Sequence, residues 1–290
     1  MHARDKLVAR LLAGTVPDIV IIGGGINGVG VFRDLAAQGI PALLVEAGDF
    51  ASGTSAAPSR LIHGGLRYLE TGESRLVRES LVERNLLLKN ACHVVHPQPI
   101  WVPLTSWLRG SATALARALR LTRKPGPKGA VPVGIGLRIY DLFGRAHQTM
   151  PAHRMLAGTA ARHERPALSP GVVAVGEYYD ARITHPERLV MELVADAEAD
   201  CPGALAIPYM AAGHSRGGAL TLTDRQNGAA HDIRPTVVIN AAGPWVDKVQ
   251  HGLGFSGKLM GGTRGTHLVL DTPGLAAQLG GRMLYFETAD

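Results

Sequence analysis

One short segment near the N-terminus constrains the fold more than any other part of the chain. Residues 18–22, DIVII, form a β-branched apolar run that is followed at once by glycines. Such a run predicts a buried parallel strand, and the apolar spacing of residues 26–35 predicts a helix. Residues 41–47, PALLVEA, predict the next buried strand. The sequence therefore predicts a βαβ unit of about 30 residues.

The turn inside this unit, residues 23–28, matches the pattern G-x-G-x-x-G. Gly23 permits the tight turn, Gly25 lets the backbone approach a pyrophosphate, and Gly28 lets helix and strand pack closely. The helix N-terminus offers N–H groups to the phosphates. Glu46, 18 residues after Gly28, can accept hydrogen bonds from both ribose hydroxyls and disfavours the 2′-phosphate of NADP. The pattern predicts a dinucleotide site, and it leaves open FAD and NAD.

The segment that follows Glu46 bears on this choice. Residues 51–60, ASGTSAAPSR, carry four hydroxyl side chains beside Arg60. Such a loop can run along an extended dinucleotide and bond its phosphates and ribityl chain, which favours FAD. The alternative is a surface loop without a ligand.

Residues 59–70, SRLIHGGLRYLE, combine packing residues with a glycine pair. Glycine inside an element costs about 1 kcal/mol against alanine, so the pair predicts that backbone passes close to another group. Arg67 offers a bidentate fork for a phosphate, and Tyr68 adds a hydroxyl donor. We interpret the segment as a connection between a cofactor site and a substrate site.

Periodicity gives a coarse reading of the remaining chain. Helices are expected over residues 73–90 and 185–200, a hairpin over 219–233 with a type I′ turn at Asn227-Gly228, and strands over 235–245, 266–271 and 282–287. Residues 97–136 are expected to be irregular, apart from an extended proline-rich start and a short basic helix over 111–124. The chain stops at Asp290 just after a strand-like run, and we expect a truncated or partial chain.

Composition narrows the function classes. The chain has 290 residues, 46% of them hydrophobic, and a net charge of +6. The charge suits an anionic ligand or membrane surface, but no Lys/Arg block resembles a nucleic-acid arm, so no nucleic-acid partner is expected. Cys92 and Cys201 form no metal pattern, so no metal site is expected; they suit a reducing compartment and leave one disulfide open. The sequence shows neither a signal-peptide core nor an apolar run that could span a membrane.

An ordered set of motifs is similar to the FAD-dependent glycerol-3-phosphate dehydrogenases, which are D-amino-acid-oxidase-like flavoproteins. The motifs are GGGINGVG, EAGDFASGTSAAPSRLIHGGLRYLE, ESRLVRESLVERNLLLKNACHVV, VVINAAGPWVDKV and RGTHLVL. The resemblance covers nearly the whole chain. It implies an α/β fold, with a Rossmann-like FAD-binding domain over residues 1–96 and 171–255 and an interleaved β-rich substrate domain over 97–170 and 256–290.

The same resemblance implies a reaction and its partners. A non-covalent FAD would accept hydride from sn-glycerol 3-phosphate, which becomes dihydroxyacetone phosphate, and a quinone or oxygen would take the electrons. Related substrates, such as another hydroxy acid or an amine, stay open. A non-catalytic FAD-binding remnant also stays open, because family members continue past Asp290 with a substrate arginine and a glycine-rich turn. A homodimer is left open as well.

The resemblance also assigns residues to roles. His267 would take the hydroxyl proton, and His63 would contact the flavin or support the site. The residues expected to bind substrate are Arg67, Tyr68 and Arg264. The residues expected to bind FAD are Gly23, Gly25, Asn27, Gly28, Glu46, Thr54, Ser55, Ser59, Arg60, Leu61, His63, Gly64, Gly65 and Gly243. The family often has lysine where Arg60 and Arg264 stand, and the two cations are not equivalent.

A quinone-reducing enzyme needs contact with a membrane. The basic stretch from Arg109 to Lys128, with Trp101, Trp107 and Leu108, suits peripheral docking on anionic lipid. A solvated loop is the alternative. We therefore expect a cytoplasmic protein and leave open a peripheral position on the inner face of the cell membrane.

Overall fold

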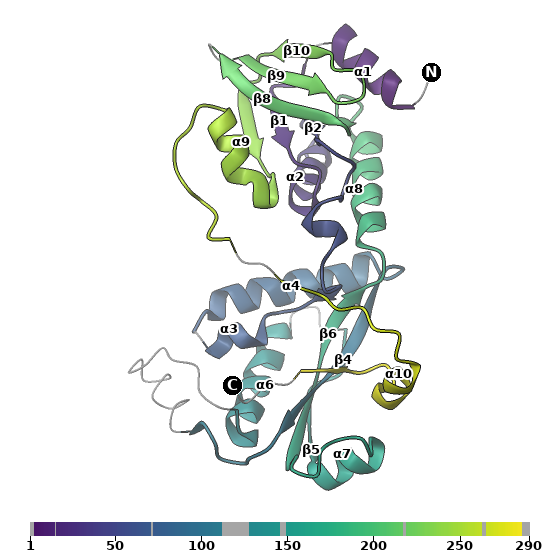
Figure 1. The fold of residues 1–290 in the computed structure, drawn as a ribbon, viewed down its shortest axis with the longest axis vertical. Helices are drawn as coiled ribbons and strands as arrows, with labels where there is room; N and C mark the ends of the chain where they lie inside the picture. The colour runs from purple at the N-terminus through teal and green to yellow at the C-terminus, as the bar shows by residue number, and fades with distance from the viewer. Residues whose placement is uncertain are drawn as a thin grey trace. The chain divides into compact units, whose positions relative to one another are not determined.

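The computed structural model describes residues 3–14, 16–70, 72–111, 128–145, 149–216, 219–262 and 265–285. The chain forms two compact units, each made of two separate stretches: residues 1–59 with 185–267, and residues 60–184 with 268–290. These divisions differ from the expected domain bounds, because residues 60–96 and 171–184 fall in the second unit and residues 256–267 fall in the first. Figure 1 shows the elements of both units.

The first unit is built on a four-stranded parallel sheet in the order β11-β1-β2-β7. Its strands are β1 (Ile19–Ile22), β2 (Ala42–Val45), β7 (Leu205–Ile207) and β11 (Val237–Asn240). The predicted βαβ unit is present, because α2 (Ile26–Ala37) connects β1 to β2. A parallel sheet with helical crossovers is the Rossmann-like arrangement that the glycine pattern predicted.

Both faces of this sheet are covered. One core joins Ile21 and Leu44 to Phe32 of α2 and Val190 of α8 (Pro186–Asp200). The other joins Val20 and Leu43 to an antiparallel sheet of β8 (Met210–Arg216), β9 (Ala219–Asp224) and β10 (Ala230–Ile233). Further helices on this side are α1 (Ala3–Ala13) and α9 (Val246–Gly252). Burial on both faces explains why the strands are continuous apolar runs.

The hairpin of β9 and β10 is confirmed, but its predicted turn is wrong. Gly228 has a φ of +77°, whereas Asn227 is not among the described residues with positive φ. A type I′ turn requires positive φ at both central residues. Instead, the Asn227 side chain accepts a hydrogen bond from the Ala229 N–H (2.8 Å), which closes a longer loop.

The second unit is built on a mixed sheet in the order β12-β4-β6-β3, with β5 paired to β6 as well. Its strands are β3 (Leu61–Ile62), β4 (Val95–Leu104), β5 (Arg154–Ala157), β6 (Ala174–Ile183) and β12 (Met283–Leu284). Its described helices are α3 (Leu66–Glu70), α4 (Ser74–Asn90), α6 (Ala130–Gly144), α7 (Gly158–Glu164) and α10 (Pro273–Leu279). The core joins α4 and α6 to the sheet through residues such as Leu81, Leu137 and Ile100.

Strand β4 shows how a proline-rich segment can still form a strand. Pro97, Pro99 and Pro103 all occupy alternate positions of the ladder with β6. The Thr184 N–H donates to the Val94 carbonyl, so the even-numbered residues of β4 face β6. The prolines therefore point their missing donors away from β6. The predicted extended start of residues 97–136 is confirmed as β4, whereas the prediction of irregular structure is wrong for α6.

Some of the other predicted elements are confirmed and others are wrong. The helices over 73–90 and 185–200 are confirmed as α4 and α8, and Pro186 lies in the first turn of α8 as expected. The strand predicted over 266–271 is wrong, because this stretch has no regular structure and Val269 is 97% exposed. The basic helix predicted over 111–124 lies outside the described residues, apart from Ser111. Cys92 and Cys201 are both free cysteines.

Candidate functional site

The βα turn of the first unit has backbone that only glycine allows. Gly23 has a φ of +116°, and a Cβ atom there would lie 2.5 Å from the carbonyl oxygen of Ala241 at the end of β11. A Cβ atom at Gly28 would collide with the carbonyl oxygen of Gly23. The turn therefore packs tightly against two strands and the first turn of α2.

The N-terminus of α2 lies beside the hydroxyl loop. The Ile26 N–H, in the first turn of the helix, donates to Oγ of Ser55 (3.0 Å) in the short 3-10 helix Thr54–Ala56. A Cβ atom at Gly25 would lie 3.3 Å from the same Oγ. This glycine-lined end of a helix, with a hydroxyl beside it, has the donors and the open backbone that a dinucleotide pyrophosphate requires. The residues present therefore fit FAD.

Glu46 is fixed by the backbone on both sides. Its Oε2 accepts from the Gly24 N–H and its Oε1 accepts from the Gly48 N–H, both at 2.7 Å. Each carboxylate oxygen has a second lone pair, so Glu46 can still accept hydrogen bonds from a ligand. Its predicted contact with ribose hydroxyls stays a prediction.

The turn after β11 brings an aromatic ring to the same loop. Gly243, predicted to bind cofactor, has a φ of +53° and begins the 3-10 helix Gly243–Trp245. A Cβ atom at Gly53 would lie 3.0 Å from Cζ3 of Trp245, whose side chain is 54% exposed. Trp245 lies in the predicted NAAGPW turn, but sequence reasoning did not assign it to the site.

Other predicted residues of the first unit are spread more widely. Asn27, Thr54 and Ser59 are exposed around the start of α2 and the loop after β2. His267 is exposed in a stretch without regular structure, and no described contact fixes its ring as a proton acceptor. Arg264 lies outside the described residues.

The residues predicted around the glycine pair lie in the second unit. Arg60 has a φ of +60°, and Leu61 begins β3. The turn between β3 and α3 carries His63, which is exposed, and Gly64, which is buried. Helix α3 then presents Arg67 and Tyr68 to solvent. These predicted residues, which are close in sequence, thus form one short segment from β3 to α3.

The glycine pair is explained by protein neighbours. A Cβ atom at Gly64 would collide with Leu81 and would lie 2.5 Å from the Tyr140 hydroxyl. Gly65 has a φ of +72°, and a Cβ atom there would collide with the Tyr68 ring. Close packing inside the second unit therefore requires both glycines, and their predicted approach to the flavin stays a prediction.

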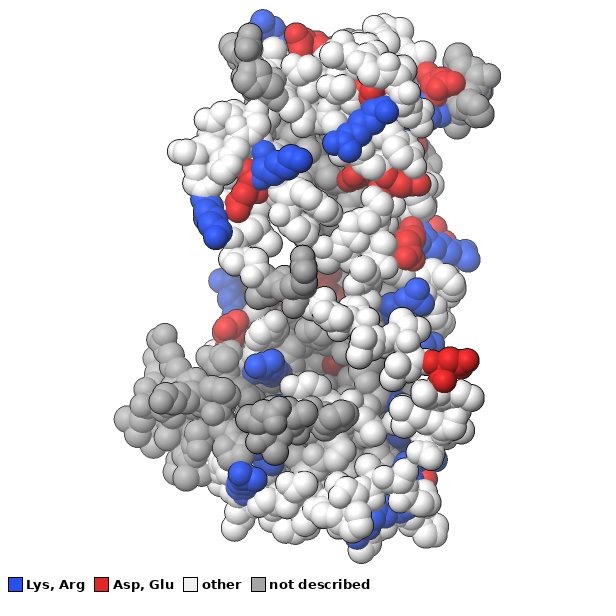
Figure 2. Space-filling view, in the orientation of Figure 1, with Lys and Arg blue, Asp and Glu red and all other residues white. Residues whose placement is uncertain are grey.

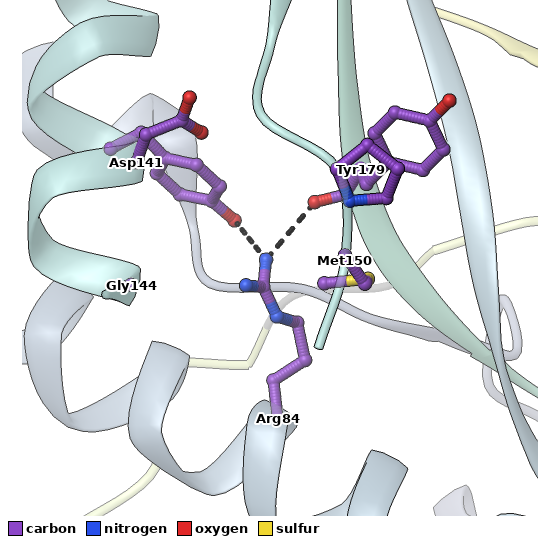
Figure 3. A pocket seen from close by; sticks show the side chains of 7 residues that line it. Arg84, Asp141, Gly144, Met150 and Tyr179 are labelled. Atoms are coloured by element: carbon purple, nitrogen blue, oxygen red, sulfur yellow. Dashed lines mark hydrogen bonds between the residues drawn. The ribbon is translucent and has the colours of Figure 1, made fainter. Parts of the chain in front are cut away.

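A buried polar network lies directly behind this turn. Oδ1 of Asp180 accepts from the Tyr140 hydroxyl (2.6 Å), from Nη1 of Arg84 (2.7 Å) and from the Gly64 N–H (3.2 Å). Figure 3 shows the Arg84 guanidinium pointing between the helix with Asp141 and Gly144 and the strand with Tyr179, whose carbonyl it reaches at 3.0 Å. A small pocket next to it is lined by Arg84, Tyr140, Asp141, Gly144, Met150, Pro151 and Tyr179.

Burial controls the protonation of this network. Burial raises the pKa of Asp180, against the opposing charge of Arg84 and the hydrogen bonds from Tyr140, Arg84 and Gly64. Burial, followed by the charge of Asp180, raises the pKa of Tyr140 well above its ordinary value. Tyr140 therefore stays a hydroxyl donor at neutral pH. Sequence reasoning missed all three side chains; the only signal was an aspartate inside the strand-like stretch YYDARI.

The residues predicted to contact a membrane differ in their exposure to solvent. Trp101 is fully buried, and its ring N–H donates to Oε2 of Glu177 (2.6 Å), so its predicted place in that surface is wrong. Trp107 and Leu108 are 54% and 69% exposed. Most of the basic stretch lies outside the described residues. Among the described residues on the face in Figure 2, Lys and Arg are scattered and interleaved with Asp and Glu.

The described part of the chain has neither a cluster of metal-ligating residues nor a helix that could span a membrane. No group of three or more His, Cys, Asp and Glu residues in that part could hold a metal ion. None of its helices combines the length and the apolarity that crossing a bilayer requires.

Comparison with known proteins gives one family and several relatives. The model of a family described as FAD dependent oxidoreductase matches residues 18–289. The chain is 36% identical to the glycerol-3-phosphate dehydrogenase of Synechocystis sp., over 92% of this chain and 48% of that protein. It is 33% identical to the D-erythritol 1-phosphate dehydrogenase of Brucella abortus, over 82% of this chain and 44% of that protein. The chain thus spans about half the length of the curated relatives it matches.

Solved structures agree on the fold. The glycerol-3-phosphate dehydrogenase from Bacillus halodurans, solved with FAD, is 25% identical and superposes with a TM-score of 0.56, over 86% of this chain and 38% of that chain. The L-proline dehydrogenase from P. horikoshii superposes with a TM-score of 0.60 at 17% identity, over 84% of this chain and 57% of that chain. The second likeness concerns the fold alone.

Proposed function

Because this chain belongs to the FAD-dependent oxidoreductase family, we propose that its protein oxidises sn-glycerol 3-phosphate to dihydroxyacetone phosphate, with FAD supplying the hydride acceptor. The observation that carries the proposal is the 36% identity to a glycerol-3-phosphate dehydrogenase over 92% of this chain. The glycine-lined N-terminus of α2 supports the cofactor part independently.

The residues of the βα turn hold the cofactor in this proposal. Gly23 and Gly28 allow the tight turn and the close packing of α2, Gly25 lets the backbone approach the pyrophosphate, and the first N–H groups of α2 donate to its oxygens. Asn27, Thr54, Ser55 and Ser59 add polar groups along the phosphates and the ribityl chain. Glu46 accepts from the ribose hydroxyls, and Gly243 lets the end of β11 approach the dinucleotide.

The exposed segment of the second unit binds the substrate and borders the flavin in this proposal. Arg67 forms a charge-assisted bidentate pair with the phosphate, and Tyr68 donates its hydroxyl. Arg60, Leu61, Gly64 and Gly65 supply the backbone beside the flavin. Arg264, the second proposed phosphate ligand, contributes another cation.

Proton removal needs a base beside the substrate hydroxyl. We assign this role to His267, which accepts the proton as the hydride leaves the same carbon. His63 supports the site next to the glycine pair. The electrons then pass to a quinone or to oxygen, and both acceptors stay open.

A related polyol phosphate is the second candidate substrate. The 33% identity to a D-erythritol 1-phosphate dehydrogenase favours it over a hydroxy acid or an amine. Both candidates present the phosphate monoester that Arg67 suits. The length of the carbon chain would then distinguish them inside the substrate site.

The test is anaerobic bleaching of the flavin absorbance. Purified protein should be yellow and should bleach with glycerol 3-phosphate, or with D-erythritol 1-phosphate for the second candidate, but not with 2-hydroxyglutarate or amino acids. Yellow protein that no polyol phosphate bleaches would contradict the reaction and support a non-catalytic remnant. Colourless protein that FAD cannot reconstitute would contradict the cofactor assignment.

Contact with an anionic membrane surface is part of the proposal. Val131, Ile135, Ile139 and Leu142 lie on one side of α6 and are 40–56% exposed. The loop with Trp107 adjoins them, because the Trp107 carbonyl accepts from the Val131 N–H (3.1 Å). An exposed apolar stripe of this kind marks an interaction site, and the exposed Arg138 among its residues suits lipid phosphates. This surface supports a peripheral position on the cytoplasmic face of the membrane. The homodimer stays a prediction that light scattering can test.

A further inference from the structure

The exposed side chains of the proposed substrate segment project from a turn whose backbone is held by buried groups. We propose that Asp180, with Arg84 and Tyr140, is a positioning group that fixes the turn between β3 and α3. The inference rests on the proposed function, because it concerns the orientation of Arg67 and Tyr68, the proposed substrate ligands.

The network holds one backbone N–H with two acceptors. The Gly64 N–H donates to the Tyr140 hydroxyl oxygen (2.9 Å) and to Oδ1 of Asp180 (3.2 Å). The Tyr140 hydroxyl donates in turn to the same Oδ1 (2.6 Å). Gly64 is therefore tied to a single carboxylate oxygen both directly and through a phenol.

The groups come from separate parts of the second unit. Asp180 lies on β6, Tyr140 on α6 and Arg84 on α4, and Asp180 is 116 residues from Gly64 and 96 residues from Arg84 in the sequence. The network therefore joins the turn to three elements that form the core of this unit. Movement of the turn would break its hydrogen bonds to α6 and β6, which Arg84 of α4 supports through Asp180.

Stability alone is a weak reason for such a network. Arg84 and Asp180 are 4% and 1% exposed, and burying an ion pair costs several kcal/mol of desolvation, so apolar residues often stabilise a core as well. Apolar packing cannot hold a backbone N–H in one direction, whereas an acceptor can. Oδ2 of Asp180 is also buried and accepts no hydrogen bond from a described residue, so the carboxylate is oriented toward the turn through Oδ1 alone.

The turn passes its position on to α3. Gly64 is closely packed, because Leu81 and Tyr140 occupy the space where a Cβ atom would lie. The Gly65 carbonyl accepts from the Tyr68 N–H (2.8 Å), which joins the turn to the helix. Leu66 and Leu69 then pack on the core, which leaves the side chains of the intervening residues outside. The network thus sets which way the exposed face of α3 points.

The test compares variants of the Asp180 network with a variant of a second buried carboxylate on β6. Tyr140→Phe removes one acceptor of the Gly64 N–H and keeps the ring. Asp180→Leu with Arg84→Met removes the other acceptor without leaving an unpaired charge. Glu177→Gln is the control, because Glu177 is also buried on β6 but is bonded to Trp101 and Arg154.

Two measurements on the protein with its bound flavin decide the outcome. We expect Tyr140→Phe and the double variant to speed amide hydrogen exchange in a peptide spanning residues 61–69. We also expect a rise of about tenfold in KM for glycerol 3-phosphate, because the turn would no longer hold Arg67 and Tyr68 in one orientation. Flavin content per protein should stay unchanged. Glu177→Gln should lower the thermal midpoint and change neither exchange in this peptide nor KM.

The positioning role would be overturned if the first two variants lowered the thermal midpoint and left exchange in residues 61–69 unchanged. It would also be overturned if exchange rose while KM and kcat for the bleaching substrate stayed the same. Failure of the proposed function shows differently, as unmodified protein that no polyol phosphate bleaches. In that case the exchange measurement still decides whether the network fixes the turn.

Discussion

The Cα of Gly28 lies directly against the carbonyl oxygen of Gly23, so that any Cβ atom at residue 28 would collide with it. We predict that Gly28→Ala destabilises the first unit by about 1–3 kcal/mol, because the βα turn must open to admit a methyl group. The same movement should abolish FAD binding. Urea unfolding and flavin content of the purified protein measure both effects.

Gly30 on the same helix is the matched control. A Cβ atom there would meet nothing within 4 Å. Gly30→Ala should keep FAD and should stabilise the helix by up to about 1 kcal/mol, because alanine has the higher helix propensity. Equal loss of flavin in both variants would show that the collision at the βα turn does not cause the loss of FAD binding in Gly28→Ala.

Arg67→Ala should separate substrate binding from cofactor binding. The side chain is exposed on α3, so its removal should leave the flavin spectrum and the thermal midpoint unchanged. Loss of a charge-assisted pair with the phosphate should raise KM for glycerol 3-phosphate by tenfold or more, about 1.5–3 kcal/mol. Arg75→Ala is the control, because it removes another exposed arginine of this unit, one that is paired with Glu79. It should leave KM for glycerol 3-phosphate and the flavin spectrum unchanged. An unchanged KM in Arg67→Ala would remove this residue from the site.

Gly65→Val should remove the yellow colour of the protein. Valine is strained at a φ of +72°, and its side chain would collide with the Tyr68 ring, so the turn and α3 must both move. Gly72→Val is a control for backbone strain, because Gly72 has a φ of +82° and open space around its Cα. Retention of flavin in Gly65→Val would show that this turn does not border the cofactor.

The ion pair between Arg4 and Asp224 predicts a pH dependence of stability. Burial raises the pKa of Asp224, but hydrogen bonds from Arg4 and from the Gln226 N–H outweigh it, so the pKa lies below its ordinary value. Asp224→Asn should cost about 1.5–3 kcal/mol at pH 7. Because the folded-state pKa is lowered, the wild-type advantage is complete above about pH 3.9 and disappears as the pH falls through the folded-state value.

Denaturant unfolding at several pH values measures this difference. Asp196→Asn, at an exposed position of α8, should stay within about 0.5 kcal/mol of the wild type throughout. A pH-independent gap between Asp224→Asn and the wild type would contradict the assignment of the effect to ionised Asp224.

The stripe on α6 predicts membrane binding that depends on one helix. Ile135→Glu should reduce sedimentation with phosphatidylserine liposomes, because a charge would replace a half-exposed apolar side chain. Leu275→Glu, at a comparably exposed position on α10, should have no effect. High salt should weaken binding of the wild type as well. Binding that is equal in all three proteins would contradict a role for α6.

The sequence predicted the first unit well because its signals are local. A buried parallel strand needs apolar residues on both faces, so the β1 and β2 runs could be recognised without their partners. The turn from Gly23 to Gly28 could also be recognised, because its backbone excludes side chains. Contacts between side chains and backbone were harder to predict. The spacing of Glu46 does not show that its carboxylate accepts hydrogen bonds from the Gly24 and Gly48 N–H groups.

The second unit was harder to predict because its central strand, β6, carries buried charged side chains. Strand β6 contains Glu177 and Asp180, which interrupt the apolar pattern that identifies a buried strand. Their partners Trp101, Arg154, Tyr140 and Arg84 lie on other elements, so no local signal shows that these charges are satisfied. The stretch 266–271 failed in the opposite way, since an apolar alternation found no partner strand among the described residues.

The prolines of β4 have a consequence for how this protein behaves at high concentration. Pro97, Pro99 and Pro103 remove donors from the margin of β4 opposite β6. On that margin β12 pairs with Ile100 and Trp101, and the Trp101 carbonyl accepts from the Tyr285 N–H (2.9 Å). An unpaired strand edge can recruit a second chain, and proline prevents this. The edge is therefore protected against self-association, and replacing these prolines would turn a sheet margin into a template for aggregation.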